Sequence, residues 1–584
     1  MDNIKPRIDQ VYKNEVLLKD HDHWLHFSAP HRSIVAENLD DVLPALHEIE
    51  SLVQANGWHA AGFLSYEAAS AFDPAHRTRP TSGFPYLWFG LYSQPHSVQL
   101  PDPEGAKDVS NWHPTIERED YNSAIAKIKD YIANGRTYQV NYTMRLQADF
   151  TDSPWDFFRR FAQTQNNHAA YIDMGRYIIC SASPELFFQL DGNTITCRPM
   201  KGTISRGRTT AEDFEQAHWL KNSEKNRAEN VMIVDMIRND LGRIAEMGSV
   251  RVPQLFEAER YPTLWQLTST VTASTNASFA DILAALFPCA SITGAPKVST
   301  LNIIADLGGT PRNINTGTIG YFSPERKAKF NVAIRTALID QDRHQAEYGV
   351  GGGIVWDSTS TDEYAEALLK ARVLTTQARP FSLLETLLWM PEEGFFLYEK
   401  HIKRMLDSAN YFDIPITKQK LETYLKQISL EFRTPQRVRV LLDRCGELRS
   451  DTHPFESSEN PRTLKTSLAR GPIDSRNVFL FHKTTLRNVY EAARMGLDEY
   501  DDVLLYNEKD ELTEFTIGNL VVELEGQLFT PPISCGVLAG TFRAHLLETG
   551  QMAERTILIQ QLSSCTRIFR VNSIRHWQEV ELRR

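Results

Sequence analysis

The sequence predicts a protein of the mixed α/β or α+β class that folds as more than one domain. At 584 residues the chain is too long for one hydrophobic core, so two or three domains are expected. Strand-like runs such as RYIICSA (176–182) and HQAEYGVGGGIVW (344–356) occur in the same region as helical stretches such as NRAENVMIVDMIRNDLGRIA (226–245) and TDEYAEALLKARVL (361–374). We therefore expect sheets with flanking helices.

Composition narrows the class of protein. The chain is 42% hydrophobic and 23% charged, which is typical of globular proteins. A net charge of -11 argues against a general nucleic-acid binder. The six cysteines form no Cys-x-x-Cys pair, so neither a zinc knuckle nor a disulfide framework is indicated. With a polar N-terminus and no apolar run of about 18 residues, no membrane association is expected and we predict a cytoplasmic protein.

A polar segment with a proline, TTQARPF (375–381), separates the helical 361–374 stretch from a fresh strand-like run, SLLETLLWM (382–390). We place the domain boundary there, giving domains at 1–375 and 376–584. Residues 1–110 carry apolar segments that we assign to the first body, whose core lies at about 110–375.

One lysine stands out in the first domain. The runs ELFFQL (185–190) and TITCRPM (194–200) flank an Asp-Gly-Asn turn signal, so they predict a hairpin in which paired residue numbers sum to about 384. Glu185 and Lys201 sum to 386 and are expected within a register step or two of each other. The pair is either a cross-strand ion pair, worth at most about 1 kcal/mol if exposed, or a buried nucleophilic amine beside a proton donor and acceptor.

Three acidic residues lie on the two predicted helices. Glu229 is near the start of the first, and Glu363 and Glu366 are three apart on the second, with Lys370 at i+4 from Glu366. They are either solvated helix faces with a salt bridge or oxygen ligands suited to Mg²⁺. The glycine-rich segments SITGAPK (291–297) and YGVGGGIV (348–355) offer backbone amides that can bind carboxylates or phosphates, although glycines also occur at bulges and turns.

The first domain resembles the chorismate-utilising enzymes in six motifs that occur in the same order. These motifs are SPELFF, RPMKGT, AENVMIVDMIRNDLGR, SITGAPK, AIRTALI and YGVGGGIVWDS. The resemblance covers about residues 110–375 and implies a chorismate-binding domain with large antiparallel sheets and flanking helices. Within that family, anthranilate synthases have alanine before the Gly-Thr of RPIAGT, whereas aminodeoxychorismate synthases have lysine there, in PIKGT. This sequence has Lys201 at that position. The resemblance therefore implies chorismate as substrate and amination at C4.

The same resemblance implies roles for individual residues. Lys201 would attack C2 of chorismate and displace the C4 hydroxyl, with Glu185 as general acid and base. The implied ligands of Mg²⁺ are Glu229 and Glu366, with Glu363 acting through water. The substrate carboxylates would be fixed by Thr293, Gly294, Arg335 and Gly352. One position departs from the family pattern, since Gln266 stands where many relatives have histidine, and no acid role is assigned there.

The second domain carries its own lysine, Lys483, after the strand-like VFLF (478–481), and by pattern alone such a lysine is solvated. Further on, GVLAGTFR (536–543) predicts a glycine-flanked helix start, which favours phosphate binding. The second domain resembles pyridoxal-phosphate enzymes of the branched-chain aminotransferase fold (fold type IV), which include aminodeoxychorismate lyase. The resemblance lies in the ordered motifs EKHIKRM, HKTTLRN, LTEFTIGN and GVLAGTFR.

This second resemblance implies a two-subdomain α+β domain over about 380–584. Lys483 would bind pyridoxal 5'-phosphate covalently and Glu514 would pair with its pyridine nitrogen. Arg404 and the amides near Thr541 would hold the phosphate, and Asn519 completes the pattern. Phe542 stands where the family often has threonine, so one hydroxyl contact to the phosphate is absent or replaced.

Together the two resemblances imply a bifunctional enzyme that makes 4-aminobenzoate from chorismate and ammonia. Two alternatives are an anthranilate or isochorismate-type synthase joined to a pyridoxal-phosphate aminotransferase, and a non-catalytic scaffold that keeps only the folds. Because no Gly-x-Cys-x-Gly nucleophile motif with a downstream His-x-Glu occurs, ammonia is expected from a separate glutamine amidotransferase subunit or from free ammonium salts. A homodimer through the pyridoxal-phosphate domain is one expected assembly.

Overall fold

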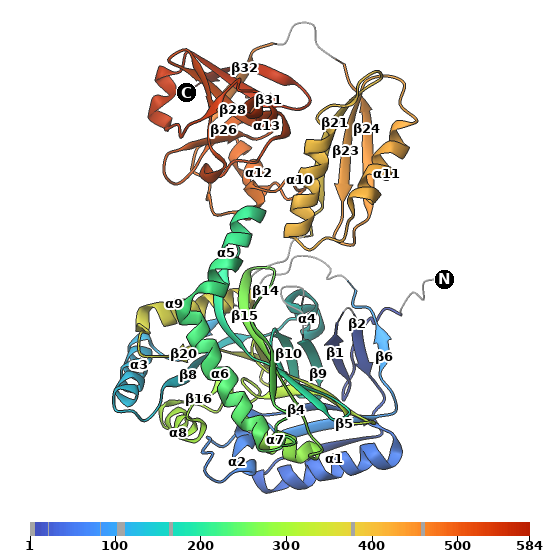
Figure 1. Ribbon diagram of the computed structural model, residues 1–584, viewed down its shortest axis with the longest axis vertical. Helices are drawn as coiled ribbons and strands as arrows, with labels where there is room; N and C mark the ends of the chain where they lie inside the picture. The colour runs from blue at the N-terminus through green and yellow to red at the C-terminus, as the bar shows by residue number, and fades with distance from the viewer. Residues whose placement is uncertain are drawn as a thin grey trace. The chain divides into compact units, whose positions relative to one another are not determined.

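The computed structural model describes residues 6–21, 23–81, 83–101, 111–162, 168–374, 380–456 and 462–583 (Figure 1). The chain forms two compact units, one made of Met1–Ser205 and Ala217–Ala378, the other of Arg206–Gln216 and Arg379–Arg584. The predicted boundary at 375/376 lies outside the described residues. Among the helices that are described, none is both long and apolar enough to span a membrane.

The first unit is built on two large sheets. The first runs in the order β16 (Gly294–Ala295), β8 (Gln139–Asp149), β20 (Gln345–Ile354), β19 (Thr336–Asp340), β10 (Tyr177–Ser183), β9 (His168–Asp173), β1 (Val16–Asp20), β2 (His23–Phe27) and β6 (His96–Val98), with β7 (His113–Pro114) beside β8. The second runs β13 (Met200–Ser205), β15 (Leu264–Ser274), β12 (Thr194–Arg198), β11 (Leu186–Asp191), β18 (Lys327–Val332), β17 (Thr318–Ser323), β4 (His59–Leu64), β5 (Leu87–Tyr92) and β3 (Arg32–Ala36), with β14 (Arg251–Arg260) beside β15. All their pairings between described strands are antiparallel, which confirms the predicted large antiparallel sheets.

Helices flank these sheets. They are α1 (Val42–Asn56), α2 (Ala69–Phe72), α3 (Arg118–Ala133), α4 (Pro154–Ala162), α6 (Glu224–Gly242), α7 (Phe279–Leu286), α8 (Lys297–Leu307) and α9 (Ser360–Ala371), while α5 (Thr210–Asn222) begins in the second unit. Both predicted site helices start at a capping side chain, because Ser223 accepts from the backbone of α6 and Thr359 from the backbone of α9. The inner face of α6 buries Ile233, Ile237 and Leu241, which fixes the helix along β13 and β15.

The predicted hairpin is present. Strands β11 and β12 pair with Leu186 opposite Arg198, the expected register, and with Asp191 opposite Thr194, one residue away, because a bulge lies between. Gly192 in the turn has a φ of 59°, a left-handed conformation that glycine adopts without strain.

The second unit contains two further sheets, as predicted for a two-subdomain α+β domain. One is the four-stranded sheet β22 (Gly394–Phe395), β21 (Leu383–Met390), β23 (Gln436–Leu442) and β24 (Leu448–Pro454), which lies beside α10 (Tyr398–Tyr411) and α11 (Lys418–Ser429) in Figure 1. The other is mixed and runs β27 (Leu512–Phe515), β26 (Asp502–Tyr506), β25 (Leu464–Leu468), β32 (His576–Arg583), β31 (Arg567–Asn572), β28 (Gly518–Leu524), β29 (Gln527–Thr530) and β30 (Ala553–Glu554), with α12 (Asn488–Arg494) and α13 (Thr541–Glu548).

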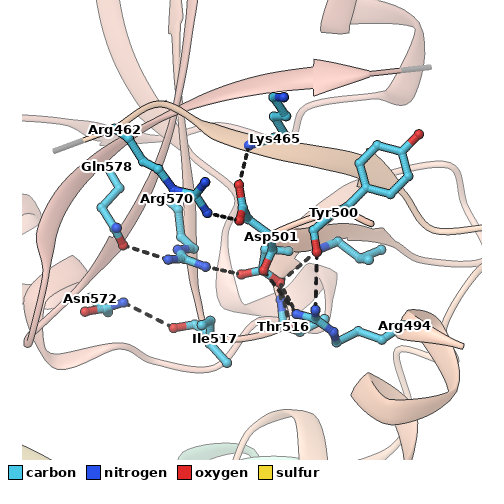
Figure 2. Close-up of polar contacts among 12 residues, drawn as sticks. Arg462, Lys465, Arg494, Tyr500, Asp501, Thr516, Ile517, Arg570, Asn572 and Gln578 are labelled. Atoms are coloured by element: carbon cyan, nitrogen blue, oxygen red, sulfur yellow. Dashed lines mark hydrogen bonds and ion pairs between the residues drawn. The ribbon is translucent and has the colours of Figure 1, made fainter. Parts of the chain in front are cut away.

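A buried carboxylate braces the eight-stranded sheet. Asp502 is fully buried and accepts hydrogen bonds from the backbone N–H groups of Val503 (2.8 Å) and Thr516 (3.1 Å) and from Arg570 (2.6 Å). Figure 2 shows Asp501 next to it accepting from the backbone N–H of Lys465. The network fixes Thr516 in the turn between β28 and β27, the strand that contains Glu514.

Candidate active sites

Lys201 lies in a β-bulge of β13. The pairing with β15 shifts between Met200, opposite Thr268, and Thr203, opposite Gln266. Within the bulge Gly202 has a φ of 100°, which only glycine adopts readily. A bulge turns a side chain away from the regular alternation of the strand. Lys201 and Gly202 together therefore redirect the lysine amine away from the regular alternation of β13.

The Lys201 amine is half-buried among charged groups. Desolvation lowers its pKa from the ordinary value, and the neighbouring Lys370 lowers it further, whereas Glu229, Glu185 and Glu366 act in the opposite direction. The net shift is downward, so the neutral, nucleophilic form is more available than in a solvated lysine.

Glu185 lies between β10 and β11 and is 4% exposed. Burial raises the pKa of its carboxyl to about 7, although a hydrogen bond from Ser291 and the charge of Lys201 both act to lower it. The Oγ of Ser291 donates to its Oε1 over 2.7 Å. A carboxyl that titrates near neutrality can both give and take a proton. The structure thus brings Glu185 and Lys201 together, as the hairpin register predicts.

The three candidate metal ligands occupy α6 and α9. Burial raises the pKa of Glu363, whose Oε1 accepts from Ser358 at 2.6 Å. Burial also acts to raise the pKa of Glu366, but the ion pair with Lys370 (2.8 Å) outweighs it and holds the value below normal. The predicted i,i+4 salt bridge is therefore present.

Within the described ranges no group of three or more His, Cys, Asp or Glu side chains is arranged to hold a metal ion. Mg²⁺ normally takes only one or two protein carboxylates and completes its shell with water and substrate. The carboxylate oxygens of Glu229, Glu363 and Glu366 fit it in ligand chemistry.

Two of the predicted substrate contacts line one loop. Thr293 and Gly294 follow the short 3-10 turn η3 (Ala290–Ile292), and Gly294 pairs with Val140 of β8. Gly294 has a φ of 139°, and a Cβ there would lie 1.9 Å from the carbonyl oxygen of Gln139, so only glycine fits.

Arg335 is suited to bind an anion. Its Nη1 is buried without a hydrogen-bond partner, and desolvation lowers the pKa of the guanidinium. A buried guanidinium nitrogen left unpaired is costly, and a carboxylate ligand would satisfy it.

Sequence reasoning missed a third polar group beside Lys201. Gln139 is fully buried, and both amide atoms of its side chain are without hydrogen-bond partners. A Cβ placed on Gly353 would lie 2.6 Å from Nζ of Lys201 and 3.1 Å from the Gln139 amide, so the three residues share one spot. Gly352, the predicted contact, lies next to it and faces Glu363 at 3.1 Å by the same measure. The sequence gives no sign of this arrangement, because the position of Gln139 in a strand says nothing about the partners of its side chain.

Gln266 lies on β15 opposite Thr203, two residues from Lys201. The family's histidine position therefore borders the bulge, and here it is an amide.

In the second unit Lys483 is half-buried, and desolvation lowers the pKa of its amine to about 8, with Arg404 acting in the same direction. The expectation of a strand before it is wrong: residues Val478–Leu480 form a 3-10 turn, because the side chain of Asn477 accepts from the backbone N–H of Phe479. The backbone carbonyl of Lys483 accepts a hydrogen bond from the backbone N–H of Leu384 in β21.

Glu514 and Asn519 face each other across β27 and β28. Burial raises the pKa of Glu514 to about 8. Its Oε1 accepts from the Tyr490 hydroxyl at 2.8 Å and its Oε2 from Nδ2 of Asn519 at 3.0 Å. Neither Tyr490 nor its partner distance could be inferred from the motif, since tyrosine in a helix is usually a packing residue.

The residues predicted to hold the phosphate, Arg404 and Thr541, lie in one network of polar contacts. Arg404 makes a two-pronged contact with Glu385 (2.7 and 2.6 Å) and donates to the carbonyl of Ala539 (3.1 Å). Thr541 starts α13, and its Oγ1 lies 3.2 Å from Nε2 of His401. A Cβ on Gly540 would lie 1.9 Å from Oδ1 of Asn519, so the helix entry is closely fitted.

These residues fit pyridoxal phosphate: an amine with a lowered pKa, a buried carboxyl with a raised pKa, and an arginine of α10 that contacts the chain just before α13. Phe542, in place of the family's threonine, is buried among Val521 and Leu546 and offers no hydroxyl.

Comparisons with known proteins agree with this division. Residues 13–376 match the chorismate binding enzyme family and residues 382–582 match amino-transferase class IV. The aminodeoxychorismate synthase component 1 of Klebsiella aerogenes is 41% identical over 272 residues, which is 46% of this chain and 60% of that protein. The chain thus spans less than two thirds of this relative.

An anthranilate synthase component 1 from Aquifex aeolicus is 36% identical over 275 residues, covering 46% of this chain and 55% of the relative. The solved anthranilate synthase component I of Streptococcus pneumoniae is 25% identical, with a TM-score of 0.53 over 64% of this chain and 95% of that one. With the family match extending over more than half of its length, the chain belongs to the chorismate binding enzyme family and carries an amino-transferase class IV domain after it.

Proposed function

We propose that this chain makes 4-aminobenzoate in two steps, with residues 1–375 aminating chorismate and residues 376–584 releasing pyruvate from the product. The observation that carries the proposal is Lys201, an amine of lowered pKa in a bulge beside Glu185, whose pKa is about 7. Similarity to both aminodeoxychorismate and anthranilate synthases does not separate the two reactions. The lysine does, because an alanine at this position cannot bond to the ring.

In the first reaction the neutral amine of Lys201 attacks C2 of chorismate. The C2–N bond forms, the ring double bonds shift, and the C4–O bond breaks as protonated Glu185 gives its proton to the departing hydroxyl, which leaves as water. Ammonia then bonds to C4 while the C2–N bond breaks and frees the lysine. The surplus proton of the incoming ammonia returns to Glu185, which restores both groups.

Anionic substrate groups meet cationic and amide donors. The guanidinium of Arg335 binds one carboxylate, and the loop at Thr293 and Gly294 and the backbone at Gly352 offer further donors. Glu229 and Glu366 would hold Mg²⁺, with Glu363 reaching it through water, and the ion would neutralise the ring carboxylate.

The second unit would hold pyridoxal phosphate. Lys483 would bind it covalently, Glu514 supported by Asn519 would pair with its ring nitrogen, and Arg404 and the start of α13 at Thr541 would hold its phosphate. When bound, the cofactor supplies the electron sink. Lys483, once the substrate amine has replaced it on the cofactor, would be a free amine with a pKa of about 8 and would take the proton from C4 of aminodeoxychorismate. The bond between ring C3 and the enolpyruvyl oxygen would break, the ring would become aromatic, and the departing enolpyruvate would take up a proton at its methylene carbon to become pyruvate.

Ammonia would come from a separate glutamine amidotransferase subunit, which fits the description of the relatives as component 1 of their enzymes. This part of the proposal predicts that ammonium salts replace the partner in vitro.

The test is to incubate the purified chain with chorismate, Mg²⁺, ammonium and pyridoxal phosphate and to identify the aromatic product. We expect 4-aminobenzoate and pyruvate. The appearance of 2-aminobenzoate would overturn the first assignment in favour of an anthranilate synthase, and aminodeoxychorismate that accumulates unchanged would remove the lyase half. Lys201→Ala should abolish the first step, while Lys483→Ala should leave it and block only the second.

A further inference from the structure

The second unit includes a short piece of chain that is remote from it in sequence. Arg206–Gln216 follows β13, the strand of Lys201, yet it clusters with Arg379–Arg584. Sequence motifs of the second domain begin only at about residue 380, so nothing in them accounts for this piece. Its contacts within the second unit include Tyr411 and His482, and His482 directly precedes Lys483.

The side chain of Arg206 anchors the segment. It is 5% exposed and pairs over 2.7 Å with Asp213, which is 4% exposed. Its guanidinium lies 4.3 Å from the centroid of the Tyr411 ring and donates to the Tyr411 carbonyl at 2.8 Å. A buried ion pair is favourable only when its geometry and additional hydrogen bonds repay desolvation. Such an arrangement specifies one docked position rather than a loose surface contact.

The next two residues hold the rings through their backbone. The carbonyl of Gly207 accepts from the Tyr411 hydroxyl at 2.7 Å, and the carbonyl of Arg208 lies 3.2 Å from Nε2 of His482. A Cβ on Gly207 would lie 2.2 Å from the backbone nitrogen of Asp213, so this turn of the segment requires glycine.

The tautomer of His482 follows from these contacts. Burial lowers the pKa of His482 to about 4, so the ring is neutral at neutral pH. Because Nε2 faces a carbonyl, it carries the proton, and Nδ1 then accepts from the hydroxyl of Ser408 at 3.0 Å. The Tyr411 and His482 ring centroids are 4.3 Å apart. His482 is therefore fixed on three sides, one of which is the remote segment.

We propose that Arg206–Arg208 is a positioning element of the second site, which sets the backbone of Lys483 by holding His482 and Tyr411. The inference rests on the proposed function, in which Lys483 binds pyridoxal phosphate. On the other side the Lys483 carbonyl is held by Leu384, so the lysine is fixed between β21 and this segment. A fragment that begins at residue 379 would therefore lack part of the second site, because it would not contain Arg206–Arg208.

The test uses the full chain and Tyr411→Phe, which removes only the hydroxyl that donates to Gly207. Tyr424→Phe is the matched control, since the Tyr424 hydroxyl donates to Ser450 at 2.9 Å in the same unit, away from the segment. The readouts are the apparent Kd for pyridoxal phosphate and the pH at which the absorbance of the bound cofactor changes. We expect a several-fold weaker Kd and a shifted absorbance titration for Tyr411→Phe, in line with the loss of one buried hydrogen bond, and wild-type behaviour for Tyr424→Phe.

Arg206→Lys is the second variant, because lysine keeps the charge but cannot both pair with Asp213 and stack on Tyr411. It should show the same two changes. If both variants fold, as judged by circular dichroism, and bind the cofactor with the wild-type Kd and absorbance titration, the segment does not position Lys483. Failure of the wild-type chain to bind pyridoxal phosphate at all would instead refute the proposed function.

Discussion

Ser291 donates a hydrogen bond through Oγ to Oε1 of Glu185 over 2.7 Å, although the two residues are 106 positions apart in the chain. Glu185 is buried, and burial raises the pKa of its carboxyl to about 7. The serine acts in the opposite direction because it stabilises the charged form. Ser291 thus keeps the carboxyl close to neutrality, where it can donate and accept a proton.

Ser291→Ala is expected to raise the pKa of Glu185. A hydrogen bond to a charged group contributes roughly 1.5–3 kcal/mol, and one pKa unit corresponds to about 1.4 kcal/mol. Because Glu185 acts first as a protonated acid, the alkaline limb of the pH profile of kcat/KM for chorismate amination should move upward by about one pH unit. The matched control is Ser181→Ala, since Ser181 is a buried serine bonded to Thr336 at 2.8 Å and should leave the profile unchanged. A Ser291→Ala profile that superimposes on the wild type would contradict this role.

Gln139→Leu should separate stability from activity. A buried amide without partners costs about 1–3 kcal/mol, so leucine is expected to leave the melting temperature unchanged or raise it. If the amide serves the substrate beside Lys201, the rate of chorismate amination should fall at least tenfold. Gln189→Leu is the control for the loss of an amide elsewhere, because Gln189 is a half-buried residue of β11. Full activity in Gln139→Leu would show that the unpaired amide has no part in the reaction.

Much of the fold could be predicted because it is encoded locally. The β11–β12 hairpin follows from two strand-like runs around one turn signal, and α6 and α9 follow from periodicity and capping residues. The candidate lysines and carboxylates were named from motifs, and the structure gathers Lys201 with Glu185 and Glu229.

What could not be predicted depends on partners distant in sequence or on a few dihedral angles. The bulge at Lys201 and Gly202 is set by pairing with β15, some sixty residues later. The 3-10 turn before Lys483 replaces an expected strand, since a single side chain, that of Asn477, caps it. Apolar runs of four residues do not distinguish these outcomes. Asp502 and its partners likewise come from three separate stretches of chain.

Glu67→Gln should stabilise the protein in alkaline but not in acidic solution. Burial raises the pKa of Glu67 to about 7, against an ordinary value of 4.5, and its Oε2 has no hydrogen-bond partner. A raised pKa means that the folded state favours the protonated acid, so this contribution to stability is complete below pH 4.5 and is lost as the pH rises through 7. The loss is on the order of 3 kcal/mol.

Glutamine remains neutral and does not suffer this loss. The melting temperature of Glu67→Gln should therefore exceed that of the wild type at pH values of about 8 and approach it at pH values of about 4. The control is Glu325→Gln, at an exposed glutamate paired with Lys327, whose melting temperature should follow the wild type at both pH values. An equal difference between Glu67→Gln and wild type at the two pH values would rule out the titration of Glu67 as its cause.

Three neighbouring glycines of β20 should respond differently to alanine. A Cβ on Gly351 would lie 2.0 Å from the backbone carbonyl oxygen of Tyr142 in β8, which cannot move without separating the strands. Gly351→Ala should therefore lower the melting temperature strongly or prevent folding. On Gly353 the nearest neighbours of the Cβ would be Nζ of Lys201, at 2.6 Å, and the Gln139 amide, at 3.1 Å, both at the ends of side chains. Gly353→Ala should fold normally but displace the amine, so that chorismate amination falls at least tenfold.

Gly352→Ala is the intermediate case, because its Cβ would lie 3.1 Å from Oε2 of Glu363 and 3.6 Å from Nζ of Lys370, contacts that a small shift relieves. We expect near-normal stability and a change confined to the KM for chorismate or the Mg²⁺ requirement, since Lys201 is untouched. Melting temperatures and steady-state kinetics of the three variants, measured together, separate backbone packing from chemistry. If Gly351→Ala were as stable as Gly353→Ala, the close packing of β20 on β8 would be contradicted. If Gly353→Ala were as active as the wild type, the close approach of β20 to the amine of Lys201 would not be a feature of the working enzyme.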